Sequence, residues 1–193
     1  MGKIEKMKNP KPAEDSKVIR ARRMDAMAKA STVTFTLEPA VHRFMEAQAK
    51  AADMNLTHYM QKLVETHVID AAEPNDPLAL RLAGKRHVIN HALETATRLD
   101  EAGKFDEHFI LTVIKEASKD ATFAEQYQQA LGGADAAGSR AAERQRVSLN
   151  QQVGRVIKKA AGARSKRNES GKIARAQVSG EIISTYTLLE KPA

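Results

Sequence analysis

Basic side chains are concentrated in two segments of the chain, where their ammonium and guanidinium groups could bind a polyanion. Residues 1–31 contain nine Lys or Arg against four Asp or Glu, and residues 139–175 contain eleven against two. Residues 32–138 contain ten against sixteen, a net charge of −6. Because Lys and Arg beside phosphates release condensed counterions, this distribution indicates a nucleic-acid partner. The alternative is that the basic termini only solubilise the chain.

The second basic segment is predicted to begin with an amphipathic helix over residues 144–161, whose apolar face includes Val153 and Ile157. The basic residues that could touch a DNA backbone are Arg144, Arg155, Lys158, Lys159, Arg164, Lys166 and Arg167. The alternative is a solvated basic helix that packs on the acidic middle of the chain. A membrane contact is disfavoured, because the apolar face lacks bulky Trp, Phe or Leu anchors.

Catalytic and metal-binding patterns are weak in this sequence. His87 and His91 have the spacing of two zinc ligands on a helix, but the glutamate of a metalloprotease motif is missing and the chain has no cysteine. The stretch AGKRH at residues 83–87 lacks the preceding glycine and the Ser or Thr of a phosphate loop. No GxSxG motif occurs. We therefore expect no metal, no cofactor and no enzymatic activity.

Composition places the chain in an intracellular setting. It has 193 residues, no cysteine and no tryptophan. The N-terminal stretch has no apolar segment of signal-peptide length, and no run of about 18 apolar residues occurs. We expect a cytoplasmic protein, associated with the nucleoid if it binds DNA.

The N-terminal third has a strand pattern followed by two helix patterns. In residues 31–37 threonines alternate with Val33, Phe35 and Leu37, which is the period of a strand with one buried face. Pro39 suits the first turn of a helix over residues 39–52. Thr57 is the predicted N-cap of a second helix.

The remainder of the chain is predicted to be helical after a boundary at residues 71–77. Its expected helices cover residues 78–101, 106–118, 120–131 with Asp120 as cap, and 144–161. A glycine-rich joint falls at residues 132–139. Residues 173–189 are predicted to be helical, with strand left open because β-branched residues favour either.

The stretch TVTFTLEPAVHRFMEAQAKAADMNLTHYMQKLVETHV resembles the ribbon-helix-helix DNA-binding superfamily, which includes the Arc and MetJ repressors. The resemblance covers about residues 31–70 and implies a dimer whose two strands pair and enter the major groove. It implies that Thr32, Thr34 and Thr36 face bases while Val33, Phe35 and Leu37 form the core. It also implies that the backbone N–H groups of Thr57 and His58 hold a phosphate.

The expected fold class is mainly α, with an N-terminal ribbon-helix-helix that has one strand per chain pairing antiparallel in a dimer, followed by a helical C-terminal region. Residues 1–30 are expected to be a flexible basic arm whose Arg22, Arg23 and Lys29 contact phosphates. The expected domains are the ribbon-helix-helix domain at 31–72, an oligomerisation or partner domain at 78–131, and a basic helical region at 140–193.

The sequence predicts a dimeric, sequence-preferring protein that binds double-stranded DNA and represses transcription. The alternatives are an accessory factor for plasmid or phage DNA, in relaxosome assembly, partition or recombination, and an antitoxin that neutralises a partner protein. An antitoxin would be expected to carry a disordered tail, whereas residues 78–131 have the pattern of a folded segment.

Overall fold

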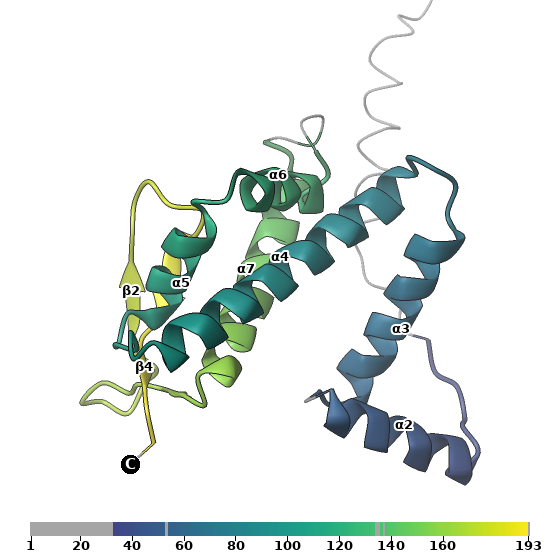
Figure 1. Cartoon of the computed structure of the whole chain (residues 1–193), viewed down its shortest axis with the longest axis horizontal. Coiled ribbons are helices and arrows are strands. Elements are labelled where there is room, and N and C mark those ends of the chain that lie inside the picture. Colours follow the sequence, from purple (N-terminus) through teal and green to yellow (C-terminus); the bar gives the residue numbers. More distant parts are fainter. Residues whose placement is uncertain (1–32, 53, 134–135, 137, 193) are drawn as a thin grey trace, which may run out of the picture.

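The computed structural model describes residues 33–52, 54–133, 136 and 138–192. Helices dominate this part of the chain, and four short strands lie near its C-terminus (Figure 1). The helices are α2 (Pro39–Ala51), α3 (Leu56–Ala71), α4 (Pro77–Glu101), α5 (Phe109–Ala117), α6 (Ala121–Ala130) and α7 (Arg140–Ala160). The strands are β1 (Arg164–Ser165), β2 (Arg175–Gln177), β3 (Thr185–Thr187) and β4 (Leu189–Glu190). No helix in the described ranges is long and apolar enough to cross a membrane.

The expected N-terminal ribbon is wrong, because residues 33–38 form no strand in the structure. The strands lie instead at residues 164–190. The apolar side chains predicted as the ribbon's core are not a core either, since Val33 is 79% exposed and Phe35 is 58% exposed. An alternating pattern gives a strand only where a neighbouring strand accepts and donates the backbone hydrogen bonds.

The α2 and α3 helices begin where short-range signals set them. Pro39 occupies the first turn of α2, as predicted. The cap of α3 is Asn55 and not Thr57, because the Asn55 side chain accepts a hydrogen bond from the His58 N–H at 2.8 Å. Thr57 therefore falls inside the first turn of α3.

Three of the four C-terminal helices, α4, α6 and α7, begin at a polar residue whose side chain accepts a hydrogen bond from the first turn, whereas α5 has no such cap. Asp76 caps α4 by accepting from the N–H groups of Leu78 and Ala79, and Ser139 caps α7. Asp120 accepts from the Thr122 N–H at 2.8 Å, which confirms its prediction as the cap of α6.

Residues 173–189 are not helical, which corrects the helix predicted there. β2 pairs antiparallel with β3, with Ala176 opposite Tyr186, and β1 pairs antiparallel with β4. The side chains of Tyr186 and Leu189, which belong to these strands, are buried. The β-branched and aromatic side chains of β3 suit a pleated, half-buried surface, and Gly180 adopts a φ of 80° in the connection between β2 and β3.

One buried cluster joins the helices from α4 onward to the strands. Its largest fully buried side chains include Phe109 of α5, Phe123 of α6, Ile157 of α7 and Leu189 of β4. The cluster therefore includes residues of both segments that the sequence divides as 78–131 and 140–193. It fixes α7 and the strands relative to each other, which determines the site described below.

Polar contacts join α3 to α4. The Lys85 ammonium lies 2.6 Å from a Glu65 carboxylate oxygen, and Arg86 donates to the Thr66 hydroxyl and to the Lys62 carbonyl. α3 has no buried side chain in the single chain, and α2 buries only Ala49. The two N-terminal helices are thus attached to the C-terminal helices through α3 and the N-terminal half of α4, where these polar contacts lie (Figure 1).

Candidate functional site

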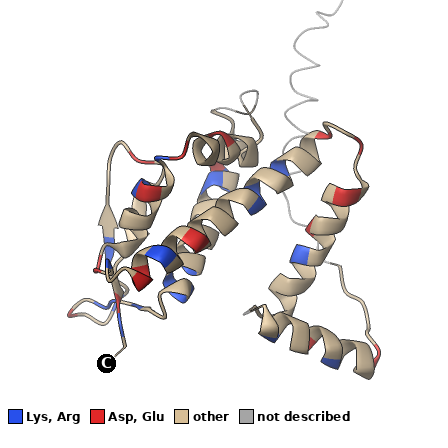
Figure 2. Ribbon diagram, viewed as in Figure 1, with Lys and Arg blue, Asp and Glu red and all other residues tan. Residues whose placement is uncertain are grey.

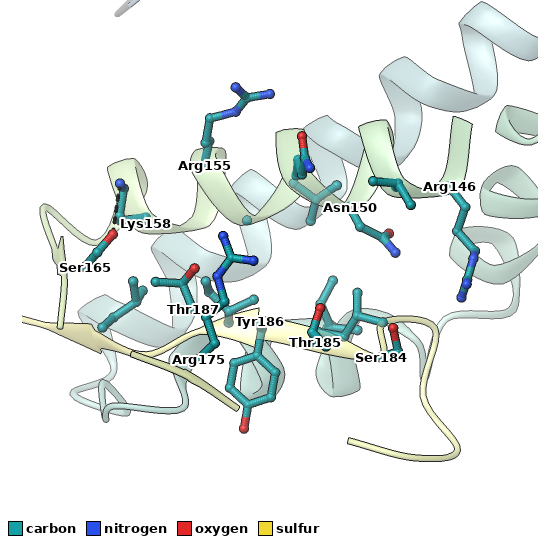
Figure 3. A pocket seen from close by; sticks show the side chains of 18 of the residues that line it. Arg146, Asn150, Arg155, Lys158, Ser165, Arg175, Ser184, Thr185, Tyr186 and Thr187 are labelled. Atoms are coloured by element: carbon teal, nitrogen blue, oxygen red, sulfur yellow. Dashed lines mark hydrogen bonds between the residues drawn. The ribbon is translucent and has the colours of Figure 1, made fainter. Parts of the chain in front are cut away.

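A groove of about 560 Å³ lies between α7 and the β2–β3 pair (Figure 3). Its floor is apolar and includes Ile110 and Ile183. Its polar lining includes one carboxylate, Glu143, together with Arg146, Asn150, Gln151, Arg155, Lys158, Ser165, Arg175, Ser184, Thr185 and Thr187. Figure 2 shows basic residues toward the C-terminal end of α7 and on the strands beside it. The groove is therefore lined by cations and hydrogen-bonding groups above an apolar base.

The α7 wall of the groove is centred on one stripe of residues, and Gln151 and Arg155 line the groove beside it. Arg146, Asn150, Gly154 and Lys158 follow one another at intervals of four, a spacing that places residues on one face of a helix. The neighbouring face is buried in the core through Leu149, Val153 and Ile157. Packing of that apolar face directs the polar stripe toward the strands.

The strand wall follows from the two-residue period of β2 and β3. Ala176 pairs with the buried Tyr186, so that pair faces the core. The alternate pair, Arg175 opposite Thr187, faces the other way and lines the groove. Figure 3 shows Arg175 reaching toward α7, while Tyr186 points away from that helix.

The cations of the groove differ in how far acidic groups neutralise them. Arg146 donates two hydrogen bonds to Glu143, at 2.7 Å and 2.9 Å, and this contact lowers the pKa of the Glu143 carboxyl. Lys158 lies 3.4 Å from the Ser165 hydroxyl. Within the described residues, Arg155 and Arg175 are exposed and have no ion pair. The groove therefore keeps a net positive charge.

Asn150 is held in the groove wall by a residue of the core. The Tyr127 hydroxyl donates to Oδ1 of Asn150 at an O–O distance of 2.7 Å. Burial raises the pKa of Tyr127 to about 12, although the hydrogen bond to Asn150 acts in the opposite direction. The hydroxyl consequently stays protonated as a donor, and the Asn150 amide NH₂ is left for a ligand.

Only two of the seven basic residues predicted from the C-terminal segment line the groove, Arg155 and Lys158. Figure 3 shows Arg155 at the outer edge, extending away from the strands. Arg144 and Lys159 lie on exposed parts of α7 outside the groove.

The other three predicted residues are paired with groups of the same chain, although none of them is buried. Arg164 lies 3.0 Å from Glu190, which is its neighbour across the β1–β4 pair. Lys166 pairs with Glu107, and their hydrogen bond lowers the pKa of the Glu107 carboxyl. Arg167 donates to the Gly171 carbonyl. The formal charge of residues 139–175 therefore exceeds the charge available to a polyanion.

The structure does not bring the N-terminal predicted residues to the groove. Thr34 and Thr36 are exposed in a segment without secondary structure. Thr57 and His58 lie in the first turn of α3, where the His58 N–H already donates to Asn55. The remaining predicted residues, Thr32, Lys29, Arg22 and Arg23, lie outside the described residues.

The two histidines with zinc-ligand spacing contact each other and an aromatic ring. His87 and His91 stack with a centroid distance of 6.0 Å, and the His91 ring lies 5.3 Å from that of Phe123. Nδ1 of His91 is 3.8 Å from a carboxylate oxygen of Asp120. No group of three potential metal ligands occurs among the residues that the structure describes.

Sequence reasoning missed the residues that complete the groove, namely Arg146, Asn150, Arg175, Thr185 and Thr187. The four-residue stripe on α7 was readable from the sequence, because Arg146 and Asn150 continue the spacing of Lys158. Arg175 gave no such signal, since its position depends on the strand pair that replaced the predicted helix.

Comparison with protein families, with curated proteins and with solved structures finds no match to this chain.

Proposed function

We propose that the protein binds double-stranded DNA as a homodimer and regulates transcription. The observation that carries the proposal is the basic groove, in which Lys158 and Arg175 come from opposite walls and Arg155 adds a cation at the edge. Phosphate contacts of Lys and Arg supply most of the affinity of sequence-independent DNA binding. Three acidic residues of the described chain lie near this surface, and each forms an ion pair with a Lys or Arg side chain. They are Glu107, Glu143 and Glu190.

The homodimer is supported by the exposed apolar side chains of the N-terminal helices. Phe44 is 62% exposed and Val64 is 61% exposed, although neither side chain has a polar group that would favour contact with water. Val41 of α2 and Leu63 of α3 are exposed as well, and identical chains commonly cover such apolar side chains by two-fold symmetric pairing. A second copy would place two basic grooves in one particle, which would increase affinity for a long polyanion by multivalency.

The test is to measure binding of mixed-sequence duplex DNA at several salt concentrations with the wild type and with Arg155→Gln/Arg175→Gln. Each lost phosphate contact should flatten the salt dependence by about 0.9 log unit. Arg175→Gln alone is compared with Lys172→Gln, the matched control, which also removes one positive charge from the same segment but outside the groove. A wild type that does not bind the duplex would contradict the proposal.

The regulatory role is tested by selecting bound fragments from the source genome. Enrichment of promoter sequences would support a transcriptional regulator. Enrichment of a transfer or partition origin would instead assign the protein to the accessory factors of plasmid or phage DNA. Uniform enrichment would mean that the protein binds DNA without sequence preference.

A further inference from the structure

We propose that the groove binds a single phosphodiester strand of the nucleic acid, and that Gly154 leaves the space in which this strand approaches α7. The inference rests on the proposed DNA binding and adds which part of the ligand enters the groove. It also assigns a positioning role to a glycine that no charge argument would identify.

The size of the groove suits one strand of a nucleic acid. Its volume of about 560 Å³ is typical of sites for small ligands, which range from about 300 to 1,000 Å³. A whole duplex cannot enter such a space, because the duplex is wider than its own major groove, which already measures about 12 Å across. A short stretch of one sugar-phosphate backbone can enter, either from a single strand or from the exposed edge of a duplex.

The lining has the chemistry of phosphate recognition. Arg175 presents a planar guanidinium that can donate two parallel hydrogen bonds to a phosphate, and Lys158 presents a compact ammonium on the facing wall. Thr185 and Thr187 add hydroxyl groups, and Asn150 adds an amide NH₂. Side chains of these types make most of the backbone contacts in protein–DNA complexes.

The lining has no base-stacking platform among the described residues. Tyr186 is the aromatic residue of the groove, but it points away from α7 and its hydroxyl lies 2.8 Å from Nδ1 of His108. Proteins that read single-stranded bases stack them on aromatic side chains. The groove is therefore suited to the backbone of the strand and not to its bases.

Gly154 lies at the centre of the α7 stripe, between Asn150 and Lys158. A glycine inside a helix is less favourable than alanine, so its presence needs a reason. Core packing does not supply one, because a Cβ added there would meet only Cδ1 of Ile110, at an ordinary 3.8 Å. A Cβ there would point toward Ile110, which belongs to the apolar floor of the groove, so the glycine leaves this part of the groove open to a strand against the helix backbone.

The experiment compares Gly154→Ala and Gly154→Leu with the wild type in the full chain. The probes are a labelled mixed-sequence single strand and the duplex of the same sequence. We expect Gly154→Ala to raise the melting temperature by about 2–4 °C, since alanine favours the helix. We expect both variants to weaken binding, Gly154→Leu by about tenfold or more. Ser148→Ala is the control, because it also favours the helix and lies on α7 outside the groove.

The outcomes separate the two proposals. If the wild type does not bind the duplex, the proposed function fails, and if it also does not bind the single strand, this inference fails with it. If the wild type binds and the folded Gly154→Leu and Arg175→Gln variants bind equally well, DNA binding stands and the groove is excluded as its site. Weaker binding that is confined to the groove variants would support the inference. The source of the strand is identified by the probe on which the groove variants lose affinity, the single strand or the duplex.

Discussion

The Tyr127 hydroxyl donates a hydrogen bond of 2.7 Å to Oδ1 of Asn150, so a core residue of α6 holds a groove residue of α7. Removal of the donor in Tyr127→Phe should lower the free energy of unfolding by about 1 kcal/mol, as measured by urea denaturation. Asn150→Ala should cost more, about 1–3 kcal/mol, because it leaves the buried tyrosine hydroxyl without an acceptor.

The double variant separates this contact from unrelated effects of the two substitutions. If the hydrogen bond couples the residues, Tyr127→Phe/Asn150→Ala should be less destabilised than the sum of the single variants, by about 0.5 kcal/mol or more. Strict additivity would show that the two side chains contribute independently and that Tyr127 does not position Asn150.

The raised pKa of Tyr127 predicts a loss of stability at alkaline pH. Burial raises this pKa to about 12, whereas an unfolded tyrosine titrates near pH 10. The stabilising contribution is therefore complete below pH 10 and is lost as the pH rises toward 12, with a total of about 2–3 kcal/mol. Urea denaturation at pH 8, 10 and 11 should show a steeper decline for the wild type than for Tyr127→Phe. Parallel declines would contradict the assignment.

Helix positions in the C-terminal part could be predicted because their signals are local. The apolar period predicted a helix over 78–101, where α4 spans Pro77–Glu101, and the Asp120 cap depends only on the two or three residues that follow it. The N-cap of α3 was predicted at Thr57, but Asn55 two residues earlier is the better cap by residue type and is the cap in the structure.

Strand positions could not be predicted, because a strand is defined by its partner. Residues 31–37 have a clean alternation but no neighbouring strand among the described residues. Residues 185–187 have a weaker pattern, yet they pair with residues 175–177. Arg175 could not be predicted as a groove residue for the same reason. Its position is fixed by its pairing with Thr187 and not by its sequence neighbours.

Disruption of the exposed apolar surface should dissociate the proposed dimer. Phe44→Glu/Val64→Glu adds two charges to side chains that are exposed in the single chain, so the monomer should stay folded. Sedimentation velocity should then change from dimer to monomer, and binding to a long duplex should weaken more than binding to a short one, because the second groove is lost. Gln48→Glu, on an exposed position of α2, is the control. A wild type that sediments as a monomer would contradict the dimer.

Gly84 should respond to alanine in the opposite way from Gly154, although both glycines lie inside helices. A Cβ at Gly84 would lie 2.8 Å from the Gln126 carbonyl oxygen and 3.0 Å from the Ala130 backbone nitrogen, so α4 and α6 would have to separate. We expect Gly84→Ala to lower the free energy of unfolding by about 1–3 kcal/mol, despite the helix preference of alanine.

The comparison of the two alanine variants by urea denaturation tests both assignments with one substitution type. The Gly84 crossing is made of backbone atoms that cannot rotate away, whereas the space beside Gly154 borders the groove. Binding of DNA, measured on the folded fraction, should be unchanged by Gly84→Ala and weakened by Gly154→Ala. Stabilisation by Gly84→Ala would mean that α4 and α6 do not approach each other this closely. In that case the packing of α4 against α6, which belongs to the core that positions α7 beside the strands, would be looser than the structure has it.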